Sequence, residues 1–283
     1  MHVMRMSHFS HIVISLSALF LTMALGESLF NDNYDVVWGF DHVIVTDGGM
    51  KVQLLMDKNS GSGFASRSSF GSGFISIGMK LQEMDTSGVV TAFYLSSEGN
   101  GKDEIDFEFL GNRDGRHVLL NTNVFVNGEG GREQQYGLWF DPSQDYHSYR
   151  ILWNHKQIVL YVDRVPIRVL KNEGGAFPSQ AMRVLGSLWN GDDWATEGGR
   201  IKTNWTNSPF HAYFQGFGVE GCAAHTWNIS SCSSDRNWWN SEKYWNLDSQ
   251  AKMMYDSVRR RFLVYDYCSD RKRYPQTPLE CSF

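Results

Sequence analysis

Residues 103–109 read DEIDFEF, in which acidic and apolar side chains alternate, and this alternation predicts a β-strand. Because alternate side chains of a strand share a face, Glu104, Asp106 and Glu108 point one way and Ile105, Phe107 and Phe109 point the other. The apolar face sets the register, since a slip of one residue would bury three carboxylates. Fold stability alone does not select a row of like charges on one face.

Short alternating segments continue on both sides of this stretch, from about residue 37 to about residue 217. Ile75, Ile77, Met79 and Leu81 alternate with small or polar residues, and residues 89–95 form a β-branched and aromatic run. Turn residues recur every roughly 8–12 positions, a spacing typical of an antiparallel sandwich. The predicted fold class is therefore all-β.

Two local features refine this prediction. Residues 158–162 and 165–169 flank the dipeptide Asp163-Arg164 and predict a hairpin. Pro166 in its second arm indicates an edge strand or a local break, because proline has no N–H to donate to the sheet. The tetrapeptide GSGF occurs at residues 61–64 and 71–74, which we interpret as one local hairpin region and not as a repeat architecture.

Composition and charge narrow the class of protein. The chain has 283 residues, a formal net charge of −5, 42% hydrophobic and 20% charged residues, which indicates a globular protein and not a disordered one. Net acidity argues against a nucleic-acid partner, because such a protein needs a basic surface. The aromatic content of 14% suits both a thick core and stacking on sugar rings, and composition does not choose between them.

Residues 1–26 have the pattern of a secretory signal peptide. Arg5 precedes an apolar run over residues 12–25, and Ala24 and Gly26 occupy the −3 and −1 positions of a cleavage site. The run is shorter than the ~20 residues that cross a bilayer. The alternative is a buried N-terminal helix. We expect a soluble mature chain outside the cell.

Secretion favours disulfides for the four cysteines, which all lie in the last quarter of the chain. Short loops close most easily, which favours Cys222 with Cys232 and Cys268 with Cys281. Zinc is the alternative, but CxxC spacing and clustered histidines are missing, so no metal site is predicted. Sequons at Asn204 and Asn228 are candidate glycosylation sites.

The last part of the chain changes character after Cys222. A helical stripe runs through Leu247, Ala251, Met254, Val258 and Phe262, with Asp248 or Ser249 as its N-cap and a solvated arginine triplet at residues 259–261 near its end. We predict that this helix packs across the sandwich. The domain prediction is a signal peptide at 1–26, a β-sandwich at 27–218, and an extension at 219–283 packed on the same domain.

The acidic row suits the cleavage of a glycosidic bond. One carboxylate attacks or stabilises the anomeric carbon while another, kept protonated, donates to the leaving oxygen, and nearby like charges raise the pKa of the protonated group. Spacing along a strand allows either the retaining or the inverting separation of carboxylates. The alternatives are a solvated acidic face and a calcium site, although calcium prefers ligands on a flexible loop.

The stretch DEIDFEFLGN (residues 103–112) resembles the active-site strand of the plant xyloglucan endotransglucosylase/hydrolases of glycoside hydrolase family 16. Further motifs match that family's pattern in order, and they cover nearly all of the mature chain. They are TAFYLSS (91–97), TNVFVNGEGGREQ (122–134), LWFDPSQDYHSYRILW (138–153), LWNGDDWATEGGRIKTNW (188–205) and RYPQTPLEC (273–281).

The resemblance implies a β-jelly-roll sandwich with a long cleft and a retaining mechanism, and it implies that the disulfide-stapled C-terminal extension lengthens the acceptor side of the cleft. Glu104 is then the nucleophile, Glu108 the general acid/base, and Asp106 the helper between them. The family's sugar contacts fall on Glu108, Asn121, Thr122, Asn123, Gly131, Arg132, Glu133, Asp193, Trp194, Gly198 and Arg273.

The implied activity is that of a secreted xyloglucan endotransglucosylase of the cell wall and apoplast. It needs no cofactor, takes xyloglucan as donor and xyloglucan or an oligosaccharide as acceptor, and is expected to be a monomer. A xyloglucan or other β-glucan hydrolase and a non-catalytic glucan-binding protein are the alternatives. A binding protein does not need the acid triplet.

The chain departs from the family pattern in four places. Lys102 stands where histidine is usual, Asn121 where glutamine is usual, and Gly131 where asparagine is usual. Residues 112–114 lack the sequon that often follows the strand. Other residues have two readings: Trp189 and Tyr94 either line the cleft or pack in the core, and Arg132 with Glu133 is either a sugar contact or a surface ion pair.

Overall fold

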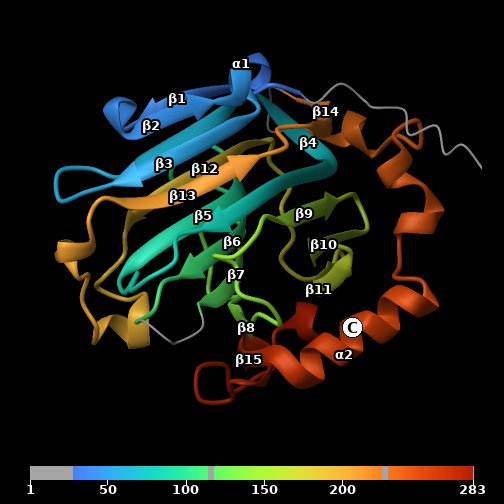
Figure 1. Ribbon diagram of the computed structural model, residues 1–283. Coiled ribbons are helices and arrows are strands. Elements are labelled where there is room, and N and C mark those ends of the chain that lie inside the picture. The colour runs from blue at the N-terminus through green and yellow to red at the C-terminus, as the bar shows by residue number, and fades with distance from the viewer. Residues whose placement is uncertain (1–27, 114–117, 225–228, 283) are drawn as a thin grey trace, which may run out of the picture.

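The computed structural model describes residues 28–113, 118–224 and 229–282. Two layers of antiparallel strands pack face to face, and Figure 1 shows a helix near the C-terminus lying beside them. The predicted all-β sandwich is confirmed. The strands are β1 Tyr34–Trp38, β2 Val43–Thr46, β3 Lys51–Met56, β4 Ser62–Leu81, β5 Val89–Ser96, β6 Glu104–Leu110, β7 Leu119–Phe125, β8 Gln134–Gly137, β9 His147–Trp153, β10 Gln157–Val162, β11 Val165–Lys171, β12 Met182–Asn190, β13 Phe210–Gln215, β14 Val219–Ala223 and β15 Leu263–Asp266.

The first layer carries the acidic strand β6 near its centre. Its order is β1-β4-β12-β5-β6-β7-β8-β15. The second layer has the order β2-β3-β13-β4-β9-β10-β11, with β14 also paired to β4. The α-helices are α1 Phe30–Asn33 and α2 Ser249–Phe262.

Strand β4 belongs to both layers. Its first half, up to Phe70, pairs with β1 and β12, and its second half pairs with β9, β13 and β14. The hairpin predicted from the two GSGF tetrapeptides is therefore wrong, because both lie along this one strand or at its start. Gly71 and Gly73 serve close approach instead of a turn. A Cβ on Gly71 would lie 2.7 Å from the Ile229 side chain, and one on Gly73 would lie 2.7 Å from the Glu220 carbonyl.

The core between the layers takes the apolar side of the acidic strand. Ile105, Phe107 and Phe109 are at most 1% exposed, as the alternation predicts. Phe107 stacks on Phe93, and both Phe107 and Phe109 meet Tyr149 of β9 edge-on. Burying each such side chain stabilises the fold by about 1.5–3 kcal/mol, which offsets the repulsion within the acid row.

The predicted hairpin is confirmed as β10 and β11. Strand β11 lies at the edge of the second layer, and the register between the two strands shifts at Leu160/Tyr161, opposite Pro166. Both consequences expected from Pro166, an edge position and a local break, therefore occur together.

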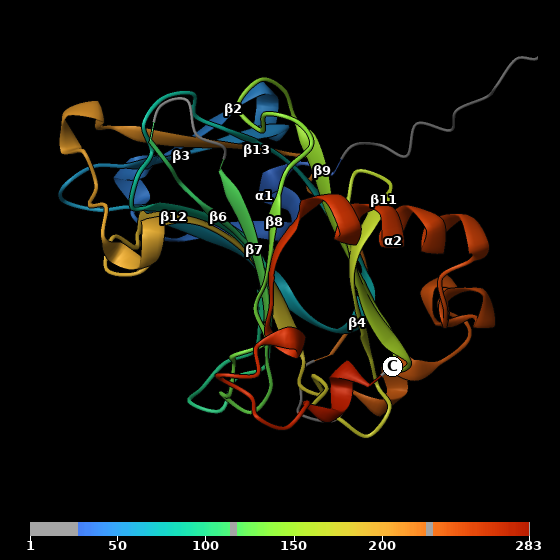
Figure 2. The same cartoon turned by 90° about the horizontal axis from the view of Figure 1, so that it is seen from below.

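The C-terminal segment is continuous with the sandwich. Strand β14 pairs with β4, and β15 pairs with β8 at the far edge of the first layer. Helix α2 begins after Asp248, whose side chain accepts a hydrogen bond from the Ala251 amide, and it contacts β11 (Figure 2). The predicted disulfides, Cys222–Cys232 and Cys268–Cys281, are confirmed. Of the helices in the described ranges, none has the length and apolarity to cross a membrane.

Candidate active site

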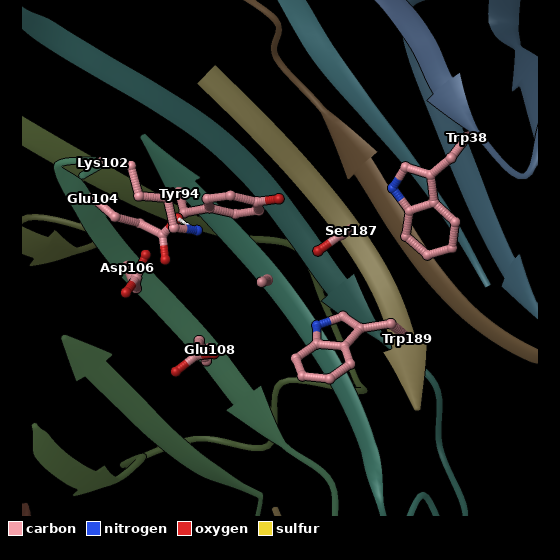
Figure 3. Close-up of a pocket in the computed structure, with 9 residues that line it drawn as sticks. Trp38, Tyr94, Lys102, Glu104, Asp106, Glu108, Ser187 and Trp189 are labelled. Atoms are coloured by element: carbon pink, nitrogen blue, oxygen red, sulfur yellow. Dashed lines mark hydrogen bonds and ion pairs between the residues drawn. The ribbon is translucent and has the colours of Figure 1, made fainter. Parts of the chain in front are cut away.

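Three carboxylates lie on the outer face of β6, as the alternation predicts. Glu104 is 9% exposed, Asp106 is 4% exposed, and Glu108 is partly exposed (Figure 3). Strands β5 and β7 flank β6 and enclose the acids. Asp106 stands between Tyr94 of β5 and Asn123 of β7, and Glu108 stands between Ala92 and Asn121.

The two outer carboxylates have different partners. The Lys102 ammonium lies 2.5 Å from Oε2 of Glu104, so a cation faces that end of the row. Nδ2 of Asn121 donates to Oε2 of Glu108 at 2.8 Å. The two glutamates therefore have different electrostatic surroundings, because Glu104 contacts a cation and Glu108 contacts a neutral amide.

Burial and mutual repulsion raise two pKa values in the row. The pKa of Asp106 is well above its usual range, because burial disfavours the charged form and the carboxylates of Glu104 and Glu108 lie on both sides. Burial raises the pKa of Glu108 to about 7, while the hydrogen bond from Asn121 acts in the opposite direction. The row therefore keeps a protonated carboxylic acid near neutral pH, which is what a general acid needs.

A hollow of about 410 Å³ extends from the acids across β5 and β12 to β1 (Figure 3). We call it the Trp38 hollow. Its aromatic side chains are Tyr94, Trp189 and Trp38, and burial raises the pKa of Tyr94 to about 12, so its hydroxyl stays a donor. Trp189 and Tyr94 thus line the cleft, although Trp189 also packs against a small cluster that contains Val90.

A second hollow, of about 420 Å³, extends from the same three acids in the opposite direction, across β7 and β8 to β15. We call it the Arg273 hollow. It is lined by Glu104, Asp106, Glu108, Asn121, Asn123, Phe125, Glu133, Gln135, Trp194, Tyr265 and Arg273. Two of these residues, Tyr265 and Arg273, come from the predicted C-terminal extension, so that segment forms part of the wall.

Together the two hollows form one groove that runs across the strands of the first layer. From β1 to β15 the layer takes seven inter-strand steps, or about 34 Å at ~4.8 Å per step. The acid triplet lies within the groove and not at its end. Such a groove can hold a linear polymer on both sides of the bond that is cut.

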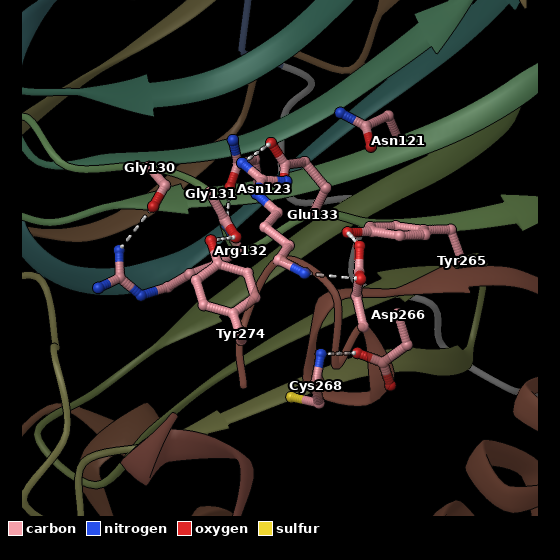
Figure 4. Close-up of polar contacts among 12 residues, drawn as sticks. Asn121, Asn123, Gly130, Gly131, Arg132, Glu133, Tyr265, Asp266, Cys268 and Tyr274 are labelled. Atoms are coloured by element: carbon pink, nitrogen blue, oxygen red, sulfur yellow. Dashed lines mark hydrogen bonds and ion pairs between the residues drawn. The ribbon is translucent and has the colours of Figure 1, made fainter. Parts of the chain in front are cut away.

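Several predicted contact residues meet in the Arg273 hollow. Asn121 and Asn123 share a face of β7, and Trp194 lines the hollow with its side chain 38% exposed. Glu133 pairs with Arg273 at 2.7 Å. Figure 4 shows Asn123, Glu133 and Tyr265 on this side of the groove.

Two predicted contact residues do not present their side chains to the groove. Thr122 is fully buried, because it alternates with Asn121 and Asn123, and its hydroxyl donates to the Gln134 carbonyl. The Thr122 side chain is thus not available to a sugar in the groove, and a sugar contact at this residue stays a prediction. Arg132 lies 2.8 Å from Glu280, so the suggested Arg132–Glu133 surface pair is wrong.

Gly131 supports the wall without lining it. Its φ is +86°, a left-handed conformation that favours glycine, and its carbonyl accepts the Tyr274 hydroxyl at 2.6 Å (Figure 4). A Cβ here would lie 2.5 Å from that hydroxyl and 3.2 Å from Arg273 Nη2. This chain therefore has no room for a side chain at position 131 unless the tail moves.

Asp193 and Gly198 are close to Trp194 in sequence. Neither of them is among the described residues that line the Trp38 hollow or the Arg273 hollow. The Asp193 side chain is 94% exposed and pairs with Lys202 at 3.0 Å. Gly198 has a φ of +67° within the 3-10 segment Thr196–Gly199, where it permits a sharp kink.

Sequence reasoning missed several lining residues. Trp38, Ser187, Phe125, Gln135 and Tyr265 come from five different strands, and only Phe125 stands within a motif quoted above. The period-two pattern predicts that each faces outward or inward on its own strand. It does not predict which strands become neighbours of β6.

The remaining site predictions concern modification and metals. Asn204 is exposed, and its side-chain oxygen accepts the Thr206 hydroxyl of the same sequon at 2.7 Å. Asn228 and residues 1–26 lie outside the described residues. Within the part of the chain that is described, no group of three His, Cys, Asp or Glu side chains is placed to hold a metal ion.

Solved structures share the fold. A β-glucanase from Bacillus licheniformis superposes with a TM-score of 0.55 at 23% identity, over 67% of this chain and 92% of its own. The Crh5 transglycosylase superposes with a TM-score of 0.55 at 24% identity, over 67% of this chain and 79% of its own. The predicted jelly roll is thus confirmed as the architecture.

Sequence relatives are much closer. Residues 30–207 match Glycosyl hydrolases family 16, and residues 233–281 match Xyloglucan endo-transglycosylase (XET) C-terminus. Xyloglucan endotransglucosylase/hydrolase protein 2 of Arabidopsis thaliana is 51% identical over 89% of this chain and 88% of its own length. Xyloglucan endotransglucosylase protein 2 of Diospyros kaki is 48% identical over 89% of this chain and 87% of its own length. The chain is therefore a member of glycosyl hydrolase family 16, within its xyloglucan endotransglucosylase/hydrolase group.

Proposed function

We propose that this protein is a xyloglucan endotransglucosylase, which cuts the β-1,4-glucan backbone of one xyloglucan chain with retention and joins the new end to another. The names of its close relatives and its matching C-terminal segment support the substrate and the reaction. The observation that carries the proposal is the acid triplet lying within a groove that is open on both sides.

In the first step, the carboxylate of Glu104 attacks the anomeric carbon and forms a glycosyl ester. The bond to the leaving 4-oxygen breaks, and the carboxylic acid of Glu108 gives its proton to that oxygen. A pKa of about 7 keeps most Glu108 protonated in mildly acidic solution. The Lys102 ammonium, 2.5 Å from Oε2 of Glu104, places a positive charge beside the carboxylate that attacks.

In the second step, Glu108 acts as a base. It takes the proton from the 4-hydroxyl of an acceptor chain, whose oxygen attacks the anomeric carbon and releases Glu104 as a carboxylate. Asp106 lies between the two glutamates with a pKa well above its usual range. Its O–H can donate a hydrogen bond to whichever flanking glutamate is charged at each stage, so Asp106 keeps Glu104 and Glu108 in position.

We assign the acceptor to the Arg273 hollow. Arg273, Glu133 and Tyr265 present polar groups there, and Trp194 offers a partly exposed indole face for stacking on a sugar. Transfer to sugar is faster than hydrolysis when the acceptor hydroxyl is held in position, since positioning can lower the activation barrier by ~7–11 kcal/mol. Hydrolysis of xyloglucan is the second candidate, because the relatives' names include both activities.

The cellular setting is also part of the proposal. We infer that residues 1–26 direct the chain into the plant cell wall and apoplast, where it acts as a monomer. Asn204 is accessible for glycosylation, and the Asn228 sequon is a second candidate. The cleft residues we assign to sugar binding are those that line the groove, together with the backbone around Gly131 and Arg132 and the exposed residues Asp193 and Gly198.

The test is incorporation of a labelled xyloglucan oligosaccharide into xyloglucan polymer. Transfer predicts label in the polymer, whereas equal chain shortening with and without acceptor, and no label incorporated, would contradict it. Glu104→Ala should lose turnover and still bind xyloglucan. A glycosyl adduct trapped on Glu104 and located by mass spectrometry would establish both the nucleophile and retention.

A further inference from the structure

Arg168 of β11 lies inside the sandwich, with only 1% of its surface exposed. Its side chain reaches from the second layer to the first. There Nη1 donates to the Thr122 carbonyl at 2.9 Å and to the Thr122 hydroxyl at 3.0 Å. The other terminal nitrogen, Nη2, is buried without a hydrogen-bond partner among the described residues.

The acids of the C-terminal segment near this guanidinium are already neutralised by other arginines. Asp266 of β15 pairs with Arg259 of α2, and Glu280 pairs with Arg132. Within the described ranges, Arg168 has no carboxylate at ion-pair distance. The Tyr267 ring lies 5.9 Å from the guanidinium carbon. Burial raises the pKa values of Tyr136 and Tyr255, and the charge of Arg168 acts on both in the opposite direction.

A buried guanidinium without a counter-charge strongly destabilises a fold. Thr122, which holds it, lies between Asn121 and Asn123 on β7, and these two residues stand opposite Glu108 and Asp106 in the register. The acid triplet is thus on the outer face of the same layer whose inner face Arg168 contacts. The positive charge lowers the pKa of Asp106, against the rise caused by burial and by the flanking glutamates.

We propose that Arg168 is a positioning residue of the acid triplet, acting through the sheet from the inner side. It holds β7 at Thr122, so that Asn121 stays in reach of Glu108. Its charge also offsets negative charge on the triplet, which allows one member to ionise in a row of three acids. The inference rests on the proposed catalytic role of the triplet and adds a residue that never touches substrate.

The experiment separates charge from hydrogen bonding. Arg168→Gln keeps an amide donor for Thr122 but removes the charge, and Arg168→Lys keeps the charge on a different donor. Arg150→Gln is the matched control, since Arg150 is a half-buried arginine on the outer face of β9, away from the groove. For each variant, kcat/KM on xyloglucan is measured against pH, and circular dichroism checks the fold.

We expect Arg168→Gln to move the limbs of the pH profile upward by about one pH unit, because losing a positive charge makes Asp106, which lies between the two glutamates, harder to ionise. Arg168→Lys should move them much less, and Arg150→Gln should not move them. A purely structural role predicts lower activity and lower melting temperature with an unmoved profile. That result, or equal shifts in the Gln and Lys variants, would overturn the proposal.

Two further measurements cover the cases in which Arg168→Gln does not fold or the proposed function itself fails. If Arg168→Gln does not fold, Thr122→Val removes the hydroxyl acceptor while the arginine stays. The proposal then predicts a lower kcat and an alkaline limb moved to higher pH, because Asn121 is held less firmly beside Glu108. An unchanged kcat with an unmoved profile refutes the positioning role. If Glu104→Ala retains turnover, the proposed function itself fails, independently of what the Arg168 variants show.

Discussion

Replacing Glu108 by glutamine tests the assignment of the proton donor. Because the pKa of Glu108 is raised to about 7, about 90% of it is protonated at pH 6 and about 10% at pH 8. The wild-type kcat/KM on xyloglucan should therefore fall about tenfold between these pH values. Glutamine cannot give up a proton, so Glu108→Gln should lose about 10²–10⁴-fold in kcat and lose this alkaline limb.

The leaving group provides the control. An aryl xyloglucan oligosaccharide with an acidic phenol needs little protonation, so its bond cleavage should be much less impaired in Glu108→Gln. Glu133→Gln is a matched substitution on the same groove wall, and it should keep the alkaline limb. If Glu108→Gln retains the alkaline limb, or loses the same factor on both substrates, Glu108 is not the acid.

The same variant has a second expected effect, on stability. A carboxyl group whose pKa is raised in the folded state binds its proton more tightly there than in the unfolded chain. The folded state then loses stability as the pH rises from about 4.5 to about 7. Glu108→Gln removes this loss and should raise the free energy of unfolding at pH 8 by about 1–3 kcal/mol. No gain at pH 8 would mean that burial does not disfavour the charge.

Three further predictions concern the neighbours of the triplet. Asn121→Ala removes a donor that favours ionised Glu108, so the pKa of Glu108 should rise and the alkaline limb should move to higher pH, and a downward move would contradict the assignment. Lys102→Met should move the alkaline limb upward and lower kcat, because the Lys102 charge lowers the pKa of Glu108, with exposed Lys58→Met as control. The ratio of transfer to hydrolysis should stay constant in Lys102→Met, because sugar and water displace the same carboxylate. Arg273→Ala should weaken acceptor binding about tenfold and shift products toward hydrolysis. Arg271→Ala, at an exposed position, should do neither. Label incorporation measured at varied acceptor concentration tests both.

The parts of the site that sequence predicted well are those that depend on local periodicity. The acid row, the apolar underside of β6 and the shared face of Asn121 and Asn123 follow from a period of two, whatever the rest of the chain does. The hairpin at β10 and β11 follows from its turn and from Pro166 in the same local way.

The predictions that failed depend on contacts between distant segments. Gly71 and Gly73 look like turn residues, but they make room for the tail and for β14. Arg132 and Glu133 are adjacent in sequence, yet each pairs with a residue about 140 positions away. Thr122 is a different case, because the local pleat turns its side chain inward between Asn121 and Asn123, which line the Arg273 hollow.

Strand β4 couples the two layers mechanically, since its first half is hydrogen-bonded into one layer and its second half into the other. A local disturbance in one layer therefore passes through a single peptide segment into the other layer. Neither layer can be exchanged or lengthened by itself, because both share this one continuous strand.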